Sequence, residues 1–432
     1  MKKILLSAAL MVACCVMNAQ KLTYIPWTDN ALMMSTAVSN NGKYLAGCDT
    51  EGRAFIYNTE SGQIKYFASP LLGDESQTTD PGADIRSVSN DGVGTGYLED
   101  KATKFDFATG QYTKADDEDN SLETYISSDG KFKLGFSYDN TYVCKPYYIK
   151  DDNKHYLPLP TDEWTGYETN GFKTANANAD GSIILGSITD NLATEPMLLW
   201  VRNRDNESYS VINVSKRFYD SSSELDGPQA TDYFNGASIS SNGKYVAVTT
   251  HLDKGSFEAG NTIARYDVAN DNVEYITCAD KDNGLSYYCG GIADDGTIVG
   301  FIEDNNTGAR YGFICKAGET EAKRISEVYP TLTDLATMDA NELNVPCNIT
   351  PDGRYIVGYG YVSMDEENLC YGSYWIDTQG GETGIGSVNG TDSSAKVVAS
   401  YSADGKKVNR TPNYRSLVIN KMNNGKIQKV IK

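Results

Sequence analysis

The sequence has few of the residues on which most catalytic centres depend. Only two of its 432 residues are histidine, His155 and His251, so a metal centre built from several histidines is excluded. The chain contains neither H-E-x-x-H nor G-x-S-x-G, the local patterns of zinc proteases and serine hydrolases. His251, which opens a long loop, is the one histidine left as a candidate general base. We assign no catalytic residue, no metal ligand and no cofactor from the sequence.

Cysteine is present without the spacing of a redox or zinc site. Seven of the nine cysteines follow residue 19, and no C-x-x-C occurs. An odd number leaves at least one unpaired thiol in a monomer. Each of the seven lies in or beside a strand-like segment, so we expect buried free thiols that pack as small apolar side chains. Cys278 and Cys289 form the pair to test first for a disulfide.

Positive charge is also scarce. Without Lys2 and Lys3, 36 basic side chains face 58 acidic ones, a net charge of −22 with histidine neutral. Such a surface repels phosphate backbones and anionic bilayers, so we expect no nucleic-acid partner. The acidity is typical of a protein that must stay soluble. Calcium binding is the alternative, although Asp116–Asn120 and Asp280–Gly284 lack the full spacing of a calcium loop.

Long apolar runs are confined to the N-terminus. Lys2 and Lys3 precede the run Ile4–Met17, which ends in "NAQ", and this order is typical of an export signal. We predict a signal peptide over residues 1–19 and a chain exported to the periplasm, the cell surface or the extracellular space. "MVAC" is an imperfect lipobox, so a lipid anchor at Cys14 is the alternative. No later stretch approaches 18 apolar residues, and we expect no membrane span.

One phrase recurs eight times along the rest of the chain. In each copy an Asn-Gly or Asp-Gly pair joins two short apolar segments, as in "AVSNNGKYLAGC" and "NITPDGRYIVGY". The turn glycines are about 52 residues apart, at positions 42, 92, 130, 181, 243, 296, 353 and 405. Asn-Gly and Asp-Gly favour type I′ hairpin turns, in which both central residues have positive φ. The chain is therefore a repeat protein built from hairpins.

Two further apolar segments follow each hairpin, so each repeat predicts four antiparallel strands. Such a sheet buries both faces only when neighbouring sheets stack around an axis, which predicts an all-β propeller. Eight copies favour eight blades. Seven is the alternative, because the last copy has Lys406, Lys407 and Arg410 where other copies are apolar.

The segment before the first copy predicts how the ring closes. Lys21–Trp27 is placed to pair with the last blade and to remove an exposed sheet edge. No linker or change in composition divides the chain. We predict a single propeller domain over residues 20–432, present as a monomer.

These repeats resemble the blade motif of TolB-like and WD-repeat-like β-propellers. Ile349–Gly358, "ITPDGRYIVG", is closest to the TolB-type phrase S-x-D-G followed by two residues and an apolar one. The resemblance covers residues 35–432. The chain departs from the WD pattern because it lacks the Gly-His and Trp-Asp signatures. The resemblance implies the propeller fold and brings no catalytic residue with it.

Long loops gather on one predicted face of the ring, opposite the short hairpin turns. They cover residues 69–84, 161–171, 215–236, 250–261, 330–344 and 361–371. Loops of this kind usually carry binding residues, and aromatic side chains offer rigid contact area to sugars and peptides. The predicted ligand-binding residues on this long-loop face are Trp164, Tyr167, Tyr219, Asp232, Tyr233, Phe234, Glu303 and Tyr361.

A central funnel should open on the same face. The residues that border it lie just before the first strand of each blade, and the candidates are Arg86, Tyr125, Lys173, Asn235 and Tyr288. Two functions remain. The first is an exported binding or scaffold protein that presents the long-loop face to a protein, peptide or glycan. The alternative is a carbohydrate-active enzyme, a glycoside hydrolase or lyase, which for hydrolysis needs two carboxylates about 5–10 Å apart in the funnel.

Overall fold

The computed structural model describes most of the chain between residues 20 and 431. The described residues are 20–25, 33–49, 52–67, 82–116, 120–138, 143–159, 171–188, 197–214, 237–250, 262–278, 284–330, 332, 345–363, 369–379, 397–402, 417–422 and 427–431. They belong to two compact units, one formed by Leu22–Thr378 and one formed by Met1–Lys21 with Gln379–Lys432.

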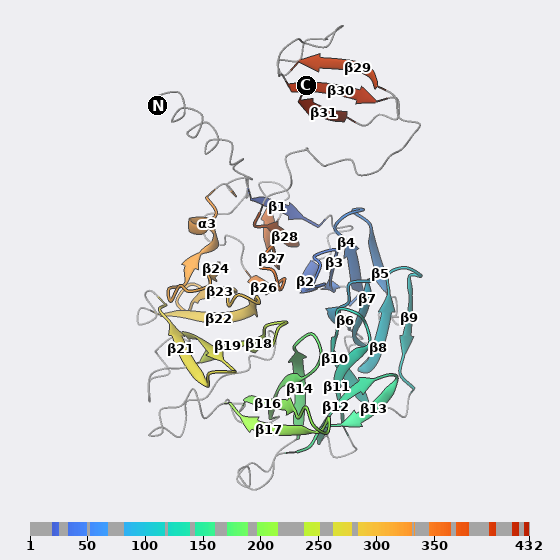
Figure 1. Ribbon diagram of the computed structural model, residues 1–432, viewed down its shortest axis with the longest axis vertical. Helices are drawn as coiled ribbons and strands as arrows, with labels where there is room; N and C mark the ends of the chain where they lie inside the picture. The colour runs from blue at the N-terminus through green and yellow to red at the C-terminus, as the bar shows by residue number, and fades with distance from the viewer. Residues whose placement is uncertain are drawn as a thin grey trace. The chain divides into compact units, whose positions relative to one another are not determined.

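Seven four-stranded antiparallel sheets make the protein a seven-bladed β-propeller. Figure 1 shows the sheets around a common centre, with the first strand of each blade innermost. Blade one comprises β2 (Met33–Val38), β3 (Tyr44–Asp49), β4 (Ala54–Asn58) and β5 (Ile64–Phe67), and blade two comprises β6 (Ala83–Val88), β7 (Val93–Leu98), β8 (Lys101–Asp106) and β9 (Gln111–Lys114). Blade three comprises β10 (Ser121–Ile126), β11 (Phe132–Tyr138), β12 (Cys144–Lys150) and β13 (Asn153–Tyr156), and blade four comprises β14 (Phe172–Ala177), β15 (Ile183–Ile188), β16 (Met197–Arg202) and β17 (Tyr209–Asn213). Blade five comprises β18 (Ala237–Ile239), β19 (Tyr245–Thr250), β20 (Thr262–Asp267) and β21 (Asn272–Ile276). Blade six comprises β22 (Leu285–Ile292), β23 (Ile298–Asp304), β24 (Arg310–Cys315) and β25 (Lys323–Arg324), and the short helix α3 (Ile325–Val328) follows it. Blade seven comprises β26 (Val345–Ile349), β27 (Tyr355–Ser363) and β28 (Leu369–Asp377) together with the N-terminal strand β1 (Lys21–Tyr24).

The N-terminal strand closes the ring. β1 pairs with β28 as the outermost strand of the seventh blade, which confirms the pairing predicted for this segment. The amide of Ile25 donates to the carbonyl of Ser373 at 2.9 Å. The amide of Ser35, in the first blade, donates to the hydroxyl of the same Ser373 at 2.7 Å. One residue of the last blade thus bonds both to the N-terminal segment and to the first blade.

The number of blades is the smaller of the two predicted numbers. The eighth copy of the repeat forms a separate three-stranded sheet in the order β29 (Val397–Ser402), β30 (Leu417–Met422) and β31 (Ile427–Ile431). The first strand of this copy pairs directly with the segment that is the third strand in other copies. The lysine-rich segment between them, where the other copies have their second strand, lies outside the described residues.

The hairpin turns differ from the predicted type I′ geometry. Gly42 has a φ of 69°, whereas Asn41 is not among the residues with positive φ. The amide of Gly42 donates to the carbonyl of Ser39 at 2.8 Å, and Ser39 then pairs with Tyr44 across a four-residue loop. Asn41 acts through its side chain, whose oxygen accepts from the Ser39 hydroxyl at 2.8 Å and from the Lys43 amide at 3.0 Å. The longer loop needs a left-handed conformation only at the glycine.

The turn glycines also receive a side chain from the preceding blade. A Cβ at Gly92 would lie 2.8 Å from the ring of Tyr44, and one at Gly181 would lie 2.6 Å from the ring of Phe132. In blades five and seven, too, the aromatic residue at this position packs against the turn glycine of the next blade. Blade two has no aromatic residue at this position, and nothing lies within 4 Å of a Cβ at Gly130. The phrase therefore encodes blade stacking as well as the turn.

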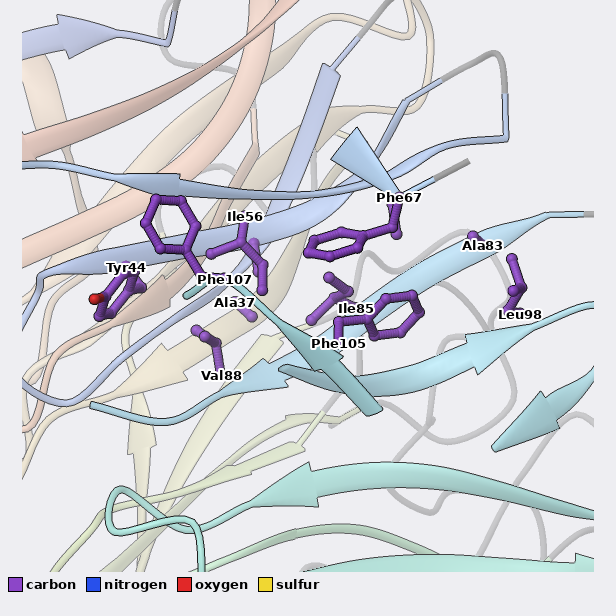
Figure 2. Close-up of a cluster of buried hydrophobic side chains, with 12 residues drawn as sticks. Ala37, Tyr44, Ile56, Phe67, Ala83, Ile85, Val88, Leu98, Phe105 and Phe107 are labelled. Atoms are coloured by element: carbon purple, nitrogen blue, oxygen red, sulfur yellow. The ribbon is translucent and has the colours of Figure 1, made fainter. Parts of the chain in front are cut away.

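Apolar side chains fill the space between neighbouring blades. Figure 2 shows the cluster between blades one and two, in which the rings of Phe67 and Phe105 lie 5.3 Å apart, and those of Tyr44 and Phe107 lie 5.2 Å apart. Burying such rings is the main stabilising contribution to stacked sheets. The ring of blades in turn fixes the positions of the innermost strands.

Candidate functional site

Among the described residues, a β-bulge shapes the innermost strand in six blades. Each bulge adds one residue opposite the second strand, and the added residues are Thr36, Arg86, Thr124, Ala175, Gly290 and Cys347. A glycine of the second strand stands opposite each bulge, and in the first blade a Cβ at Gly47 would lie 1.9 Å from the carbonyl oxygen of Met34. The bulges kink the innermost strands and re-aim their side chains.

All six bulge residues line a central cavity. The cavity has a volume of about 530 Å³, and the innermost strands of all seven blades contribute to its wall. Most lining side chains are neutral, either small and apolar or able to hydrogen bond, with Tyr97, Tyr125 and Tyr359 as the aromatic members. Concave sites of this volume commonly hold small ligands.

A hydrogen bond between non-neighbouring blades spans the cavity at the hairpin-turn end. The side-chain amide of Asn40, in blade one, donates to the hydroxyl of Ser241, in blade five, at 3.2 Å, and both residues line the cavity. Neighbouring turns are also joined, because the Ala179 amide donates to the Ser241 carbonyl at 2.7 Å and the Asn242 amide donates to Asp294 at 2.7 Å. These bonds narrow the turn end of the cavity.

The long-loop end carries one ion pair, from the beginning of β6. Asp84 and Arg86 are the only charged residues among the described residues that line the cavity. Nε of Arg86 lies 3.6 Å from Oδ2 of Asp84, and the Arg86 guanidinium lies 5.3 Å from the centre of the Tyr97 ring. Oδ1 of Asp84 is buried and accepts no hydrogen bond within the described part of the chain.

Burial dominates the ionisation of the groups around this pair. It raises the pKa of Asp84, while the neighbouring Arg86 lowers it in part. Burial and then the Asp84 carboxylate raise the pKa of the Cys48 thiol, so this thiol is neutral at pH 7. Burial also raises the pKa of Tyr125. The cavity wall offers hydrogen-bonding groups and one cation, and no thiolate.

The structure places the funnel candidates differently from one another. Arg86 and Tyr125 line the cavity. Lys173 and Tyr288 are described but do not belong to the lining, because the Lys173 ammonium lies 5.6 Å from the centre of the Phe136 ring and Tyr288 stacks on Phe301 at 4.7 Å. Asn235 lies outside the described residues.

Most candidates on the long-loop face lie outside the described residues. This holds for Trp164, Tyr167, Tyr219, Asp232, Tyr233 and Phe234. Glu303 is described on β23, where its carboxylate accepts from Nε of Arg310 at 2.7 Å. Tyr361 belongs to β27 and pairs with Tyr371 through the backbone, while its side chain lies outside the described ones.

Sequence reasoning missed several lining residues. Asp84 ends the loop predicted over residues 69–84, although it belongs to β6, and Cys48 and Tyr97 are not among the predicted site residues. A pattern for them does exist in the sequence. A glycine follows the turn glycine by four or five positions in six copies, as Gly47 follows Gly42, and each such glycine stands opposite a bulge. The residue after this glycine is the cavity residue Cys48 in blade one, Tyr97 in blade two and Tyr359 in blade seven.

The described residues hold no group of three His, Cys, Asp or Glu side chains that could bind a metal. Six cysteines from Cys48 to Cys347 are free thiols, and Cys278 and Cys289, the pair proposed for a disulfide test, are both among them. Burial raises the pKa of Cys289 to about 12 and that of Cys315 to about 11. None of the described helices combines the length and the apolar character that crossing a membrane requires.

No family model matches the chain, and no curated protein matches it. Similar solved structures include an oligogalacturonate lyase from Vibrio parahaemolyticus, with 13% identity and a TM-score of 0.49 over 82% of this chain and 93% of that chain. They also include TolB from Acinetobacter baumannii, with 14% identity and a TM-score of 0.38 over 74% and 70%. The β-propeller domain of Cps50 (Swd1) from Myceliophteria thermophila has 10% identity and a TM-score of 0.48 over 82% and 99%.

The seven four-stranded blades confirm the propeller fold that the resemblance to TolB-like and WD-repeat-like proteins implied. The likeness concerns the fold alone, and it assigns no activity, ligand or partner to this chain. The class that the sheets and the cavity define is a seven-bladed β-propeller with a central cavity.

Proposed function

We propose that this protein is an exported binding module that takes a segment of a peptide or glycan into its central cavity from the long-loop face. The observation that supports this most directly is the cavity of about 530 Å³, whose wall includes residues from all seven blades. A rigid ring positions these residues without any rearrangement, and such preorganisation lowers the entropic cost of binding. The hydrogen bond from Asn40 to Ser241 narrows the far end, so a bound segment enters and leaves on one side.

The composition of the wall favours binding over glycoside hydrolysis. Glycoside hydrolysis by the common mechanism requires two carboxylates facing one another. Among the described residues that line the cavity, Asp84 is the single carboxylate, and it is paired with Arg86. Neutral amides and hydroxyls make up most of the remaining polar groups. They can bind a ligand but are poor proton donors and acceptors at neutral pH.

The proposed location and partners rest on the sequence. The export pattern of residues 1–19 and the net charge of −22 without Lys2 and Lys3 support a place in the periplasm, at the cell surface or outside the cell, where free or tethered glycans and peptides occur. The aromatic residues proposed for the long-loop face, Trp164 and Tyr233 among them, would extend the contact beyond the cavity.

A cavity-filling substitution tests the proposal. Ala175 is a bulge residue that lines the cavity, so Ala175→Trp should fill part of it. We expect the mature chain to bind members of a glycan array or peptide library, and Ala175→Trp to weaken that binding by at least about tenfold, the loss expected when a pocket is blocked. The matched control is Ile212→Trp, which adds the same side chain on the exposed outer strand β17. Equal binding by both variants would contradict a cavity site.

The long-loop face has a separate test. Replacing Trp164 and Tyr233 by alanine should weaken binding further if the aromatic side chains extend the contact. Unchanged binding would remove these aromatic residues from the site and leave the cavity as the only contact proposed.

A further inference from the structure

Two residues break the repetition of the cavity wall. At the bulge position five described blades have small or neutral residues, namely Thr36, Thr124, Ala175, Gly290 and Cys347. Blade two alone has a long cation there, Arg86. Two positions earlier, the described blades have Met34, Leu122, Lys173, Tyr288 and Val345, and blade two alone has an acid, Asp84. A structural need of the ring would recur from blade to blade, so this departure points to a role specific to blade two.

Within the described residues, the guanidinium of Arg86 has more N–H donors than its contacts with Asp84 and Tyr97 use. Its side chain is 40% exposed, although it lies at the cavity wall, and its ion pair with Asp84 is longer than a hydrogen bond at 3.6 Å. The ring of Tyr97, 5.3 Å from the guanidinium carbon, supports the group from one side. A guanidinium carries five N–H donors in a planar fork that matches a carboxylate. Asp84 and Tyr97 therefore position the fork, and in the described part of the chain they leave some of its donors unused.

Asp84 competes for the same cation. Its side chain is 17% exposed, and its Oδ1 accepts no hydrogen bond within the described residues, so it holds Arg86 through charge more than through geometry. An incoming anion that offers two oxygens to the fork would form the better hydrogen bonds. Asp84 then sets how tightly the anion binds.

We infer that Arg86 is the recognition group of the cavity and that the ligand segment carries a carboxylate, which pairs with the Arg86 fork while the neutral remainder extends along the Asn, Ser and Thr side chains toward the turn end. The inference rests on the proposed function, because it takes the cavity as the binding site. A uronic acid of a glycan and the carboxylate of a peptide share this chemistry. The two kinds of ligand have different cellular sources, but the same atoms of the protein would recognise the carboxylate of either.

The experiment uses the mature chain on a paired array. Each uronic-acid oligosaccharide stands beside its neutral-sugar counterpart, and each peptide acid stands beside its amide, so the two sources are read separately. We expect the acid member of a pair to bind more tightly. Arg86→Gln should weaken acid binding by at least about tenfold more than it weakens the binding of neutral members, as expected for the loss of a charge-assisted hydrogen bond. Arg86→Lys, which keeps the charge and loses the fork, should fall between the two.

Asp84→Asn provides a readout that a merely structural role would not produce. Removing the competing carboxylate should tighten acid binding by about twofold to fivefold, the range of a partly exposed ion pair. Thermal melting of each variant shows that the ring is folded.

Three results would overturn the inference. If acids and their neutral counterparts bind equally, and Ala175→Trp abolishes that binding, the cavity is still the binding site but the carboxylate is not what it recognises. Acid binding that Arg86→Gln leaves unchanged would overturn the inference in the same way. If no member of the array shows binding that Ala175→Trp weakens, both this inference and the proposed function are overturned.

Discussion

Replacing Gly181 by alanine is expected to lower the free energy of unfolding by about 2 to 5 kcal/mol, the sum of about 1–2 kcal/mol for a left-handed backbone and about 1–3 kcal/mol for overpacking. Gly181 has a φ of 66°, and a Cβ there would lie 2.6 Å from the ring of Phe132. Phe132 is buried in the blade before, so its ring has little room to move. Urea unfolding of the mature chain measures the loss.

The third copy of the repeat supplies the matched control. Gly130 occupies the same turn position with a φ of 74°, and nothing lies within 4 Å of a Cβ there. Gly130→Ala should therefore cost only the backbone part, about 1–2 kcal/mol. The difference between the two variants isolates the aromatic contact between blades. Equal losses would contradict the stacking that the repeat phrase is inferred to encode.

Replacing Ile25 by alanine is expected to lower the free energy of unfolding by about 2 to 5 kcal/mol, as for other fully buried aliphatic residues. Ile25 is 0% exposed and packs with Leu45 and Phe55 of the first blade and Val357 of the seventh. The lost side chain leaves a void where the ring closes. The denaturant dependence of the unfolding free energy should stay unchanged, because the ring unfolds as one unit.

Ile25→Val is the control, with an expected cost of about 0.5–1.5 kcal/mol for one methylene. A decrease in the denaturant dependence for Ile25→Ala would show that the closing strand detaches before the ring unfolds. A loss for Ile25→Ala no larger than that for Ile25→Val would contradict the burial of Ile25 between the first and seventh blades.

The fold could be predicted from the sequence because the repeat phrase carries several kinds of information together. Its alternation sets the strands, its glycine sets the turn, and its period marks where one sheet ends and the next begins. The phrase could not decide between seven and eight blades. The eighth copy keeps the turn glycine, Gly405, but lacks the apolar residues of a second strand. A count of copies includes it all the same, because the count does not depend on that strand. The type I′ turn was wrong because the sequence does not show the loop length.

The site was less predictable for a physical reason. A cavity at the axis joins residues that are about 50 positions apart, and which of them face inward depends on the bulges. Arg86 and Tyr125 were placed near the axis from their position before the hairpin. Lys173 and Tyr288 occupy the position of Asp84 in their blades, but their side chains pack on Phe136 and Phe301. Residue type alone does not distinguish Lys173 and Tyr288, which do not line the cavity, from Arg86, which does.

Amide hydrogen exchange at the seam tests the closed ring most directly, since the cavity exists only if the first and seventh blades meet. The amides of Ile25 and Ser35 both donate to Ser373, at 2.9 Å and 2.7 Å. We expect both amides to exchange as slowly as those of β3 and β27, the second strands of the first and seventh blades, through global unfolding. Exchange of these two amides at the rate of exposed turn amides, while the central strands stay protected, would contradict the closed ring.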